Sequence, residues 1–252
     1  MKISEDNIDN NIKREDSNGI SKSEEEDDEI NEDNKYNAEI LNLPNEFSEY
    51  QINFKVIIIG NSSVGKTCIT NQATKNIFLN NYQATIGMEI FSLFLRIDKK
   101  IIKLQIWDTC GQEIYRSLIT NFYRSSSLAI IVYAINQRES FKDLSLWIKE
   151  LKLNNSPDTK IILVGNKLDL QNDRKIAYEE GQKFADDYGF IDFFETSAKT
   201  GKNIKKMFIK IANILYEDHL NYSEEASYKT FIPNNQYQIK KKRKVKDQKK
   251  CC

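Results

Sequence analysis

Apolar residues along this chain fall into short blocks whose spacing alternates between that of strands and that of helices. The β-branched block 54–59 predicts a buried strand, and 66–75 after it predicts a helix. Further strands are predicted at 90–97, 101–107, 128–135, 160–164 and 191–194. Further helices are predicted at 140–153, 178–188 and 202–216. Strands that alternate with helices indicate a doubly wound α/β fold.

The connection between strands 90–97 and 101–107 is too short for a crossover. Only residues 98–100 separate them, so we expect these two strands to pair antiparallel. The other strands mostly alternate with helices and should run parallel. The pattern therefore predicts a six-stranded, mostly parallel sheet with one antiparallel strand and helices on both faces. In such sheets ligands bind at the carboxyl ends of the strands.

Composition divides the chain into a domain and two tails. The 252 residues include 37 basic and 37 acidic ones, but the charges are segregated. Residues 1–51 are acidic and poor in aromatic side chains, so they are predicted to be disordered. Residues 52–217 have the mixed composition of a globular domain. Residues 218–252 end in a nearly continuous basic stretch, and we expect a flexible tail there.

The cysteines and the start of the chain bear on its compartment. The first residues lack the apolar core of a signal peptide, which predicts a cytosolic chain with reduced thiols. No apolar run approaches the roughly 20 residues that span a bilayer, so membrane attachment would need a lipid or a surface patch. His219 is the single histidine, which argues against histidine acid–base catalysis and against a histidine-rich metal site.

Residues 60–67 fit the phosphate-binding pattern G-x-x-x-x-G-K-[ST] and lie between a predicted strand and a predicted helix. Glycines let the backbone curl so that its N–H groups point at phosphate oxygens. Lys66 would bind the β- and γ-phosphates, and the Thr67 hydroxyl would bind Mg²⁺. The predicted phosphate-binding residues are Asn61, Ser62, Ser63, Val64, Gly65, Lys66, Thr67 and Cys68.

A second motif, 108–113, follows the strand that ends at Trp107. Asp108 stands where an acidic side chain would hold Mg²⁺ through water. Gly111 has no Cβ, so its N–H can approach a γ-phosphate closely. Gln112 could orient the attacking water, which makes Gln112 and Lys66 the predicted catalytic residues.

Two further motifs follow the next strands and predict selection of guanine. The Asp169 carboxylate can accept hydrogen bonds from the N1–H and the exocyclic amine of guanine, which adenine does not offer. A backbone N–H in 196–199 can reach guanine O6. The predicted base-binding residues are Asn166, Lys167, Asp169, Ser197, Ala198 and Lys199.

With all these motifs in this order, the chain resembles the Ras superfamily over residues 53–217, and within it the Rab family most. The Rab resemblance rests on 85–90, 103–109, 115–117, 122–124 and the terminal cysteines. It implies a P-loop GTPase fold, bound GTP or GDP and Mg²⁺, and slow GTP hydrolysis that depends on an activator. By this resemblance Phe78 contacts the guanine edge, Tyr82 covers the phosphates and Thr85 joins Thr67 and Asp108 around Mg²⁺.

The resemblance also implies a cellular role. A Rab regulates vesicle traffic, with switch I near 77–87 and switch II near 111–120 ordered by GTP. The expected partners are an exchange factor, an activating protein, effectors and a prenyl-binding escort protein. We expect a monomer that cycles between the cytosol and the cytoplasmic face of an intracellular membrane. Nucleic-acid binding is disfavoured because the core is not basic.

The chain ends in Cys251 and Cys252, which resemble the double prenylation signal of Rabs rather than a C-a-a-X motif. Two lipid chains hold a protein stably on a membrane, and the basic residues 240–244 would add attraction to anionic lipids.

Three alternative functions are compatible with parts of the sequence. The basic run also fits a nuclear localisation signal and a Ran-like nuclear role, against which the terminal cysteines argue. A scaffold that binds GTP without hydrolysing it is disfavoured by Gln112 and Thr85. A P-loop kinase is disfavoured by the guanine motif 166–169.

Overall fold

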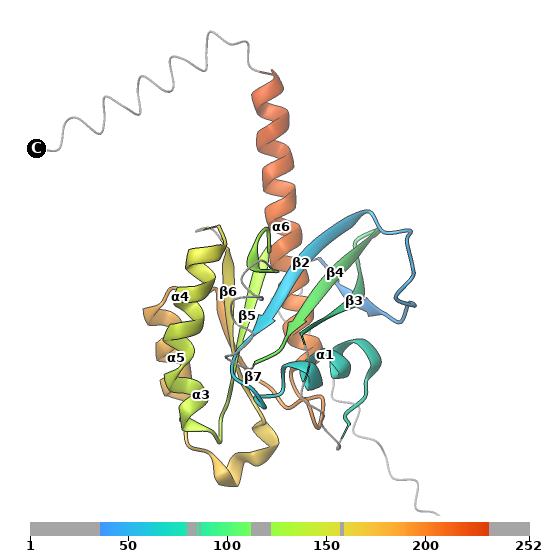
Figure 1. Cartoon of the computed structure of the whole chain (residues 1–252). Helices are drawn as coiled ribbons and strands as arrows, with labels where there is room; N and C mark the ends of the chain where they lie inside the picture. Colours follow the sequence, from blue (N-terminus) through green and yellow to red (C-terminus); the bar gives the residue numbers. More distant parts are fainter. Residues whose placement is uncertain (1–35, 80–84, 86, 112–121, 157–158, 232–252) are drawn as a thin grey trace, which may run out of the picture. The chain divides into compact units, whose positions relative to one another are not determined.

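The structure is a computed structural model, and it describes residues 36–79, 85, 87–111, 122–156 and 159–231. Its centre is one seven-stranded sheet with the strand order β1-β3-β4-β2-β5-β6-β7 (Figure 1). The strands are β1 Glu39–Leu41, β2 Ile52–Ile59, β3 Met88–Ile97, β4 Lys100–Thr109, β5 Leu128–Ala134, β6 Lys160–Asn166 and β7 Asp192–Glu195. Strand β3 runs antiparallel to both of its neighbours, and every other pair is parallel.

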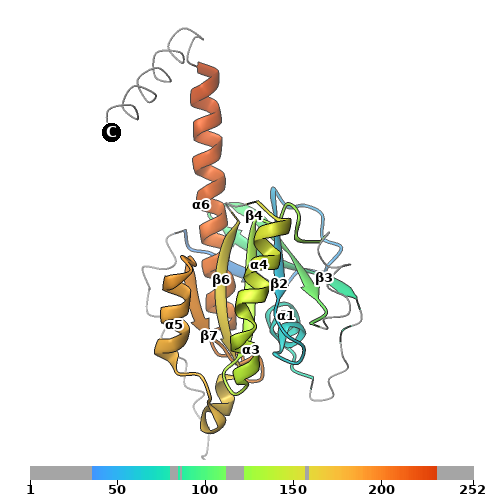
Figure 2. The same cartoon turned by 60° about the vertical axis from the view of Figure 1, so that its left-hand side comes forward.

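Helices cover both faces of the sheet (Figures 1 and 2). The described helices are α1 Lys66–Lys75, α3 Arg138–Lys142, α4 Leu144–Asn154, α5 Tyr178–Asp187 and α6 Ile204–Phe231, with the 3₁₀ helix η2 Leu168–Asp173. One apolar cluster joins α1 and α6 to the sheet, and a second cluster joins α3, α4 and α5 to its other face. Strand β5 is buried along its whole length because it lies between the two clusters.

Most predicted helices and strands are confirmed, because the apolar residues that predicted each one form its buried face. The face of the predicted helix 140–153 is buried throughout, and Trp147 at its centre is 1% exposed. Strands β3 and β4 form a tight hairpin in which Ile97 is paired with Lys100. Asp98 takes a left-handed φ of 53° in the turn, a conformation that aspartate tolerates better than most residues. No helix in the described part of the chain is both long and apolar enough to cross a bilayer.

The prediction of six strands is wrong, because a seventh, β1, lies in the segment expected to be disordered. Within residues 1–51, the part from Tyr36 onward packs on the domain. Strand β1 is paired with residues 94–96 of β3, and Glu39 forms an ion pair with Arg96. The rings of Phe47 and Tyr50 both contact Phe94. These few apolar residues are enough to order the segment, because β3 has an open edge with which β1 can pair. Residues 1–35 lie outside the described part.

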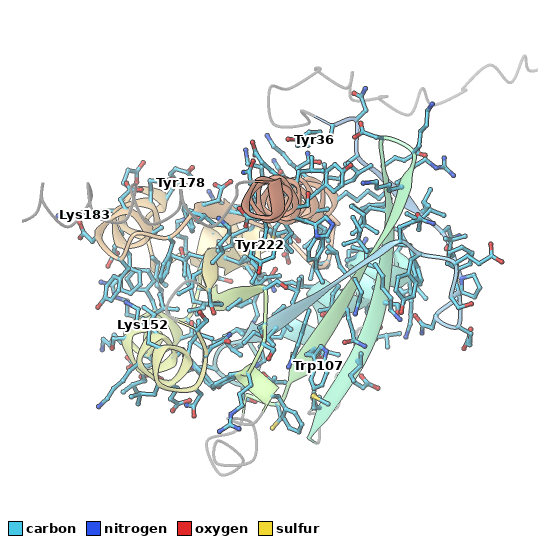
Figure 3. The ribbon with its side chains drawn as sticks, turned by 90° about the horizontal axis from the view of Figure 1, so that it is seen from above. Tyr36, Trp107, Lys152, Tyr178, Lys183 and Tyr222 are labelled. Carbon is cyan, nitrogen blue, oxygen red and sulfur yellow. The ribbon has the colours of Figure 1, made fainter. Side chains whose placement is uncertain are left out.

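Two helices also differ from their predicted bounds. The predicted helix 140–153 is divided at Asp143 into α3 and α4. Helix α6 continues to Phe231, through the first part of the predicted flexible tail 218–252. It packs on the core as far as Leu220, whereas Tyr222 is 77% exposed. Seen from above, Tyr36 lies beside α6, where its ring meets Tyr216 edge-on (Figure 3).

Replacing Phe47 by Ala should lower the free energy of unfolding by about 1–2 kcal/mol, because a half-buried ring and its contact with Phe94 are lost. Urea unfolding followed by tryptophan fluorescence measures the change. Leu153→Ala, at a side chain 73% exposed, is the control and should change stability by less than about 0.5 kcal/mol. Equal effects of the two substitutions would mean that residues 36–51 do not stabilise the domain.

Candidate functional site

The predicted site residues within the described ranges gather at the carboxyl ends of β2, β4, β6 and β7. The loop 60–65 connects β2 to α1, Asp108 lies near the end of β4, and Asn166 is the last residue of β6. The loop 196–203 follows β7 and leads to α6. Because these strands run parallel, their carboxyl ends meet at one edge of the sheet, as the sequence predicts.

Two glycines give the loop 60–65 its shape. Gly60 has a φ of 141°, and a Cβ there would lie 2.2 Å from the carbonyl oxygen of Val132 on β5. Gly65 has a φ of 99°, and a Cβ there would lie 2.3 Å from Nδ2 of Asn166. Only glycine fits both the conformation and the close approach. The loop leads into α1 with no side chain capping the helix, so N–H groups of the first turn are available to an anion.

Lys66 is buried beneath this loop. Its Nζ donates hydrogen bonds to the carbonyl oxygens of Gly60 at 2.9 Å and Asn61 at 2.8 Å. Burial lowers the pKa of Lys66 to about 8, against the opposing attraction of Asp108 and Cys110. A buried ammonium is stabilised by an anion, and phosphate oxygens would supply that charge.

Three oxygen-bearing side chains converge beside Lys66. The Thr67 hydroxyl donates to Oδ2 of Asp108 at 2.5 Å and lies 2.7 Å from the Thr85 hydroxyl. Oδ1 of Asp108 is buried and has no hydrogen-bond partner among the described residues. Burial raises the pKa of Asp108 to about 6, and the hydrogen bond from Thr67 and the positive charge of Lys66 oppose this rise. Hydroxyl and carboxylate oxygens are ligands for Mg²⁺, and a cation would satisfy this carboxylate, so the three residues fit the metal.

Asn166 holds three loops together. Its Nδ2 donates to the carbonyl oxygen of Val64 at 2.8 Å. Its Oδ1 accepts from the Thr196 hydroxyl and from the Ala198 N–H, both at 3.2 Å. Protein groups thus use both acceptor sites of this amide and one of its two N–H donors, and the residue is buried, 1% exposed. This makes Asn166 a link between the phosphate loop and the base loops.

The two predicted base-binding loops are also joined directly. The Ser197 hydroxyl donates to Oδ1 of Asp169 at 2.6 Å, and the Leu168 N–H donates to the carbonyl oxygen of Thr196 at 2.9 Å. Farther from the base, Arg174 donates two hydrogen bonds to the Glu195 carboxylate, at 2.5 and 2.7 Å. This bidentate pair ties the end of η2 to the end of β7. The Asp169 side chain is therefore fixed at a position from which it can accept from a ligand.

The remaining predicted residues lie at the rim of the site or outside the described part. Phe78 is half-buried against the cluster around α1 and α6. Cys68 and Lys167 are close enough to interact electrostatically; burial raises the thiol pKa and lowers the ammonium pKa. Ser63 and Lys199 are exposed. Tyr82, Gln112, Cys251 and Cys252 lie outside the described residues.

Several residues that shape the site were not predicted. Asp143 and Trp147 bind the side chain of Asn61, and the pair Arg174–Glu195 braces the base loops. Their distance along the chain, 82 residues from Asn61 to Asp143, leaves no local pattern that would reveal the contact. From the sequence, Trp147 is expected only as a residue of the helix 140–153.

Together the fold and the site define a P-loop nucleotide-binding protein. Its site has a buried lysine, three oxygen-bearing side chains that fit Mg²⁺, and two loops that fit a base. The model of the Ras family matches residues 55–217. The match covers more than half of the chain, so the chain belongs to the Ras family. Its members are small GTP-binding switches that bind GTP and GDP with Mg²⁺ and hydrolyse GTP. The predicted GTPase fold is thereby confirmed, apart from the number of strands.

Arg174→Lys should lower the free energy of unfolding by about 1–2 kcal/mol and speed release of bound GDP, because lysine cannot form the two parallel bonds to Glu195. The matched control is Arg138→Lys. Arg138 also binds a glutamate, Glu180, but both side chains are more than one-third exposed, so the loss of stability should be much smaller than for Arg174→Lys. Denaturant unfolding and release of a fluorescent GDP analogue measure both effects; identical results for the two variants would contradict the bracing role.

Proposed function

We propose that this chain is a Rab-type GTPase that regulates vesicle traffic at the cytoplasmic face of an intracellular membrane. The observation on which the Rab type depends is the sequence of the C-terminus, a basic run followed by Cys251 and Cys252. The Rab-like motifs 85–90 and 122–124 support the same assignment. The geometry around Lys66, Asp108 and Asn166 supports the proposed nucleotide chemistry.

Guanine selection is assigned to Asp169 and the loops around it. The bond from Ser197 fixes one carboxylate oxygen of Asp169, so the carboxylate keeps one orientation as the base enters. Guanine donates from N1–H and from its exocyclic amine to such a carboxylate. Adenine lacks both donors and would leave the carboxylate without partners. The backbone N–H of Lys199 is assigned to the O6 side of the base, because the Ala198 N–H already donates to Asn166. Phe78 is assigned to the edge of the base, and Lys167 is assigned to the base as well.

The phosphates are assigned to the loop 61–68. Backbone N–H groups of this loop and the ammonium of Lys66 bind the β- and γ-phosphates, and Tyr82 covers them from outside. Thr67, Thr85 and Asp108 would hold Mg²⁺. When bound, Mg²⁺ would neutralise part of the charge of the phosphates. Gly111 approaches the γ-phosphate with its N–H.

Hydrolysis is assigned to Gln112 and Lys66. Gln112 orients the water that attacks the γ-phosphate, and Lys66 stabilises the charge that develops on the transferred group. The sequence offers no obvious arginine to add a further positive charge from within the chain. An activating protein is therefore the expected source, and an exchange factor and effectors complete the cycle of the switch.

Membrane attachment is assigned to prenyl groups on Cys251 and Cys252, with the basic run as a second attraction. Each buried CH₂ of a lipid contributes about 0.8 kcal/mol, so two chains outweigh the basic residues. An escort protein that binds prenyl groups would carry the chain through the cytosol. The competing proposal is a nuclear, Ran-like switch, which the same basic run favours.

Asp169→Asn should lower the affinity for GTP by about 100-fold, because two hydrogen bonds to a charged acceptor are lost. The same variant should gain affinity for xanthosine triphosphate, because the amide can donate where the carboxylate accepted. The control is Asp173→Asn, an exposed aspartate four residues further along η2. Titration with fluorescent nucleotides measures both. Equal binding of ATP and GTP by the parent protein would refute guanine selection.

Replacing both Cys251 and Cys252 by Ser should move the protein from the membrane to the soluble fraction of its own cells, because both lipid anchors are lost. GTP binding should persist, since the tail lies far along the chain from the phosphate loop. Neutralising the basic run 240–244 should weaken attachment without abolishing it.

Cell fractionation and intact-mass analysis of the parent protein distinguish the two roles. A Rab-type protein should carry two prenyl groups and sediment with membranes. A parent protein with unmodified cysteines that accumulates in the nucleus would exclude the Rab type. The assignment of residues 55–217 to the Ras family would not be affected.

A further inference from the structure

The phosphate loop is hydrogen-bonded to the helices α3 and α4, which cover one face of the sheet. Asn61, the first residue after Gly60, lies 82 residues before Asp143 and 86 before Trp147. Its Nδ2 donates to Oδ2 of Asp143 at 2.6 Å, and its Oδ1 accepts from Nε1 of Trp147 at 2.6 Å. The amide thus uses one donor and one acceptor at the same time, so its orientation is fixed.

The Asp143 side chain binds Asn61 and does not cap its own helix. It lies at the N-cap of α4, where an aspartate side chain usually accepts from an N–H of its own helix. Here the carboxylate makes no such bond and binds Asn61 instead. The division of the predicted helix 140–153 into α3 and α4 occurs at this residue. The residue at which the two helices meet is therefore the one that binds the phosphate loop.

The peptide unit that follows Asn61 is in contact with Gly111. A Cβ at Gly111 would lie 2.4 Å from the Ser62 nitrogen and 2.5 Å from the Asn61 carbonyl carbon. The Asn61 carbonyl oxygen also accepts from Nζ of Lys66 at 2.8 Å. This peptide unit therefore contacts Gly111 and Lys66. It is also anchored through the Asn61 side chain, which binds Asp143 and Trp147; we call these three side chains the clamp.

We propose that Asn61 is a positioning residue, and that the clamp with Asp143 and Trp147 sets the preference of the site for a nucleoside triphosphate over a diphosphate. Asn61 acts through its backbone, by holding the peptide unit against which Gly111 packs. The inference rests on the proposed approach of Gly111 to the γ-phosphate. A diphosphate lacks the γ-phosphate that Gly111 is proposed to approach, so loosening the clamp should weaken GTP binding more than GDP binding.

The test removes single hydrogen bonds while packing is kept. Trp147→Phe retains an aromatic side chain in the buried position and removes the N–H. Asn61→Asp retains the shape of the side chain but replaces the donor to Asp143 by a second carboxylate oxygen. Each variant should raise the dissociation rate of GTP by about fivefold to tenfold, the effect expected for one such hydrogen bond, and that of GDP by less than about twofold.

The rescue experiment separates positioning from general stability. The double variant Asn61→Asp with Asp143→Asn exchanges donor and acceptor, so the bond forms again and GTP dissociation should return to within about twofold of the parent. Leu153→Ala, at an exposed position on α4, is the matched control and should leave both rates unchanged. Thermal unfolding of each GDP-bound variant shows whether the fold persists.

The outcomes are distinct. Equal acceleration of GTP and GDP release, or no rescue by the double variant when the fold is intact, would overturn the clamp as a determinant of triphosphate preference. A parent protein that binds neither nucleotide would refute the proposed function itself. A parent that binds both, with Trp147→Phe and Asn61→Asp unchanged in every rate, would refute only the clamp.

Discussion

The site depends above all on one buried amide, the side chain of Asn166. Through Nδ2 it fixes the carbonyl of Val64 in the phosphate loop, and through Oδ1 it fixes Thr196 and Ala198 in the last base loop. Its own carbonyl accepts from the Ile135 N–H after β5. A buried amide whose partners are all protein groups is costly to disturb. The phosphate loop and the last base loop are consequently held at a constant separation before any nucleotide binds.

The approach of other backbone segments to the phosphate loop explains its glycines. Gly60 is pressed against β5, Gly65 against Asn166, and Gly111 against the Asn61–Ser62 peptide unit. Each contact is closer than a Cβ would allow, so the loop is packed on several sides by the sheet edge, the base loop and the segment after β4. The polar side chains Lys66 and Asp108 are buried in this packing with charges that only partly compensate each other. Phosphate oxygens and Mg²⁺ would complete that compensation.

The segment 36–51 extends the sheet beyond the matched family region, which begins at residue 55. An unpaired strand edge exposes backbone donors and acceptors to other chains, and β1 covers that edge of β3 at residues 94–96. Lys103 lies near the rings of both Tyr50 and Phe94, so the segment is held by cation–π contact as well as by ring packing. The remainder of β3, 88–93, retains a free edge within the described residues.

The sequence by itself determined the α/β alternation, the antiparallel hairpin of β3 and β4, and the chemical identity of the site. These follow from local patterns: β-branched runs, helical spacing, and motifs in which Gly60, Lys66 and Asp169 stand at fixed offsets. Only the tertiary structure decided that β1 joins the sheet, that Asp143 serves Asn61 rather than its own helix, and that Arg174 braces Glu195. Each of these depends on partners tens of residues away, and their contact energy exists only once the sheet has brought distant segments together.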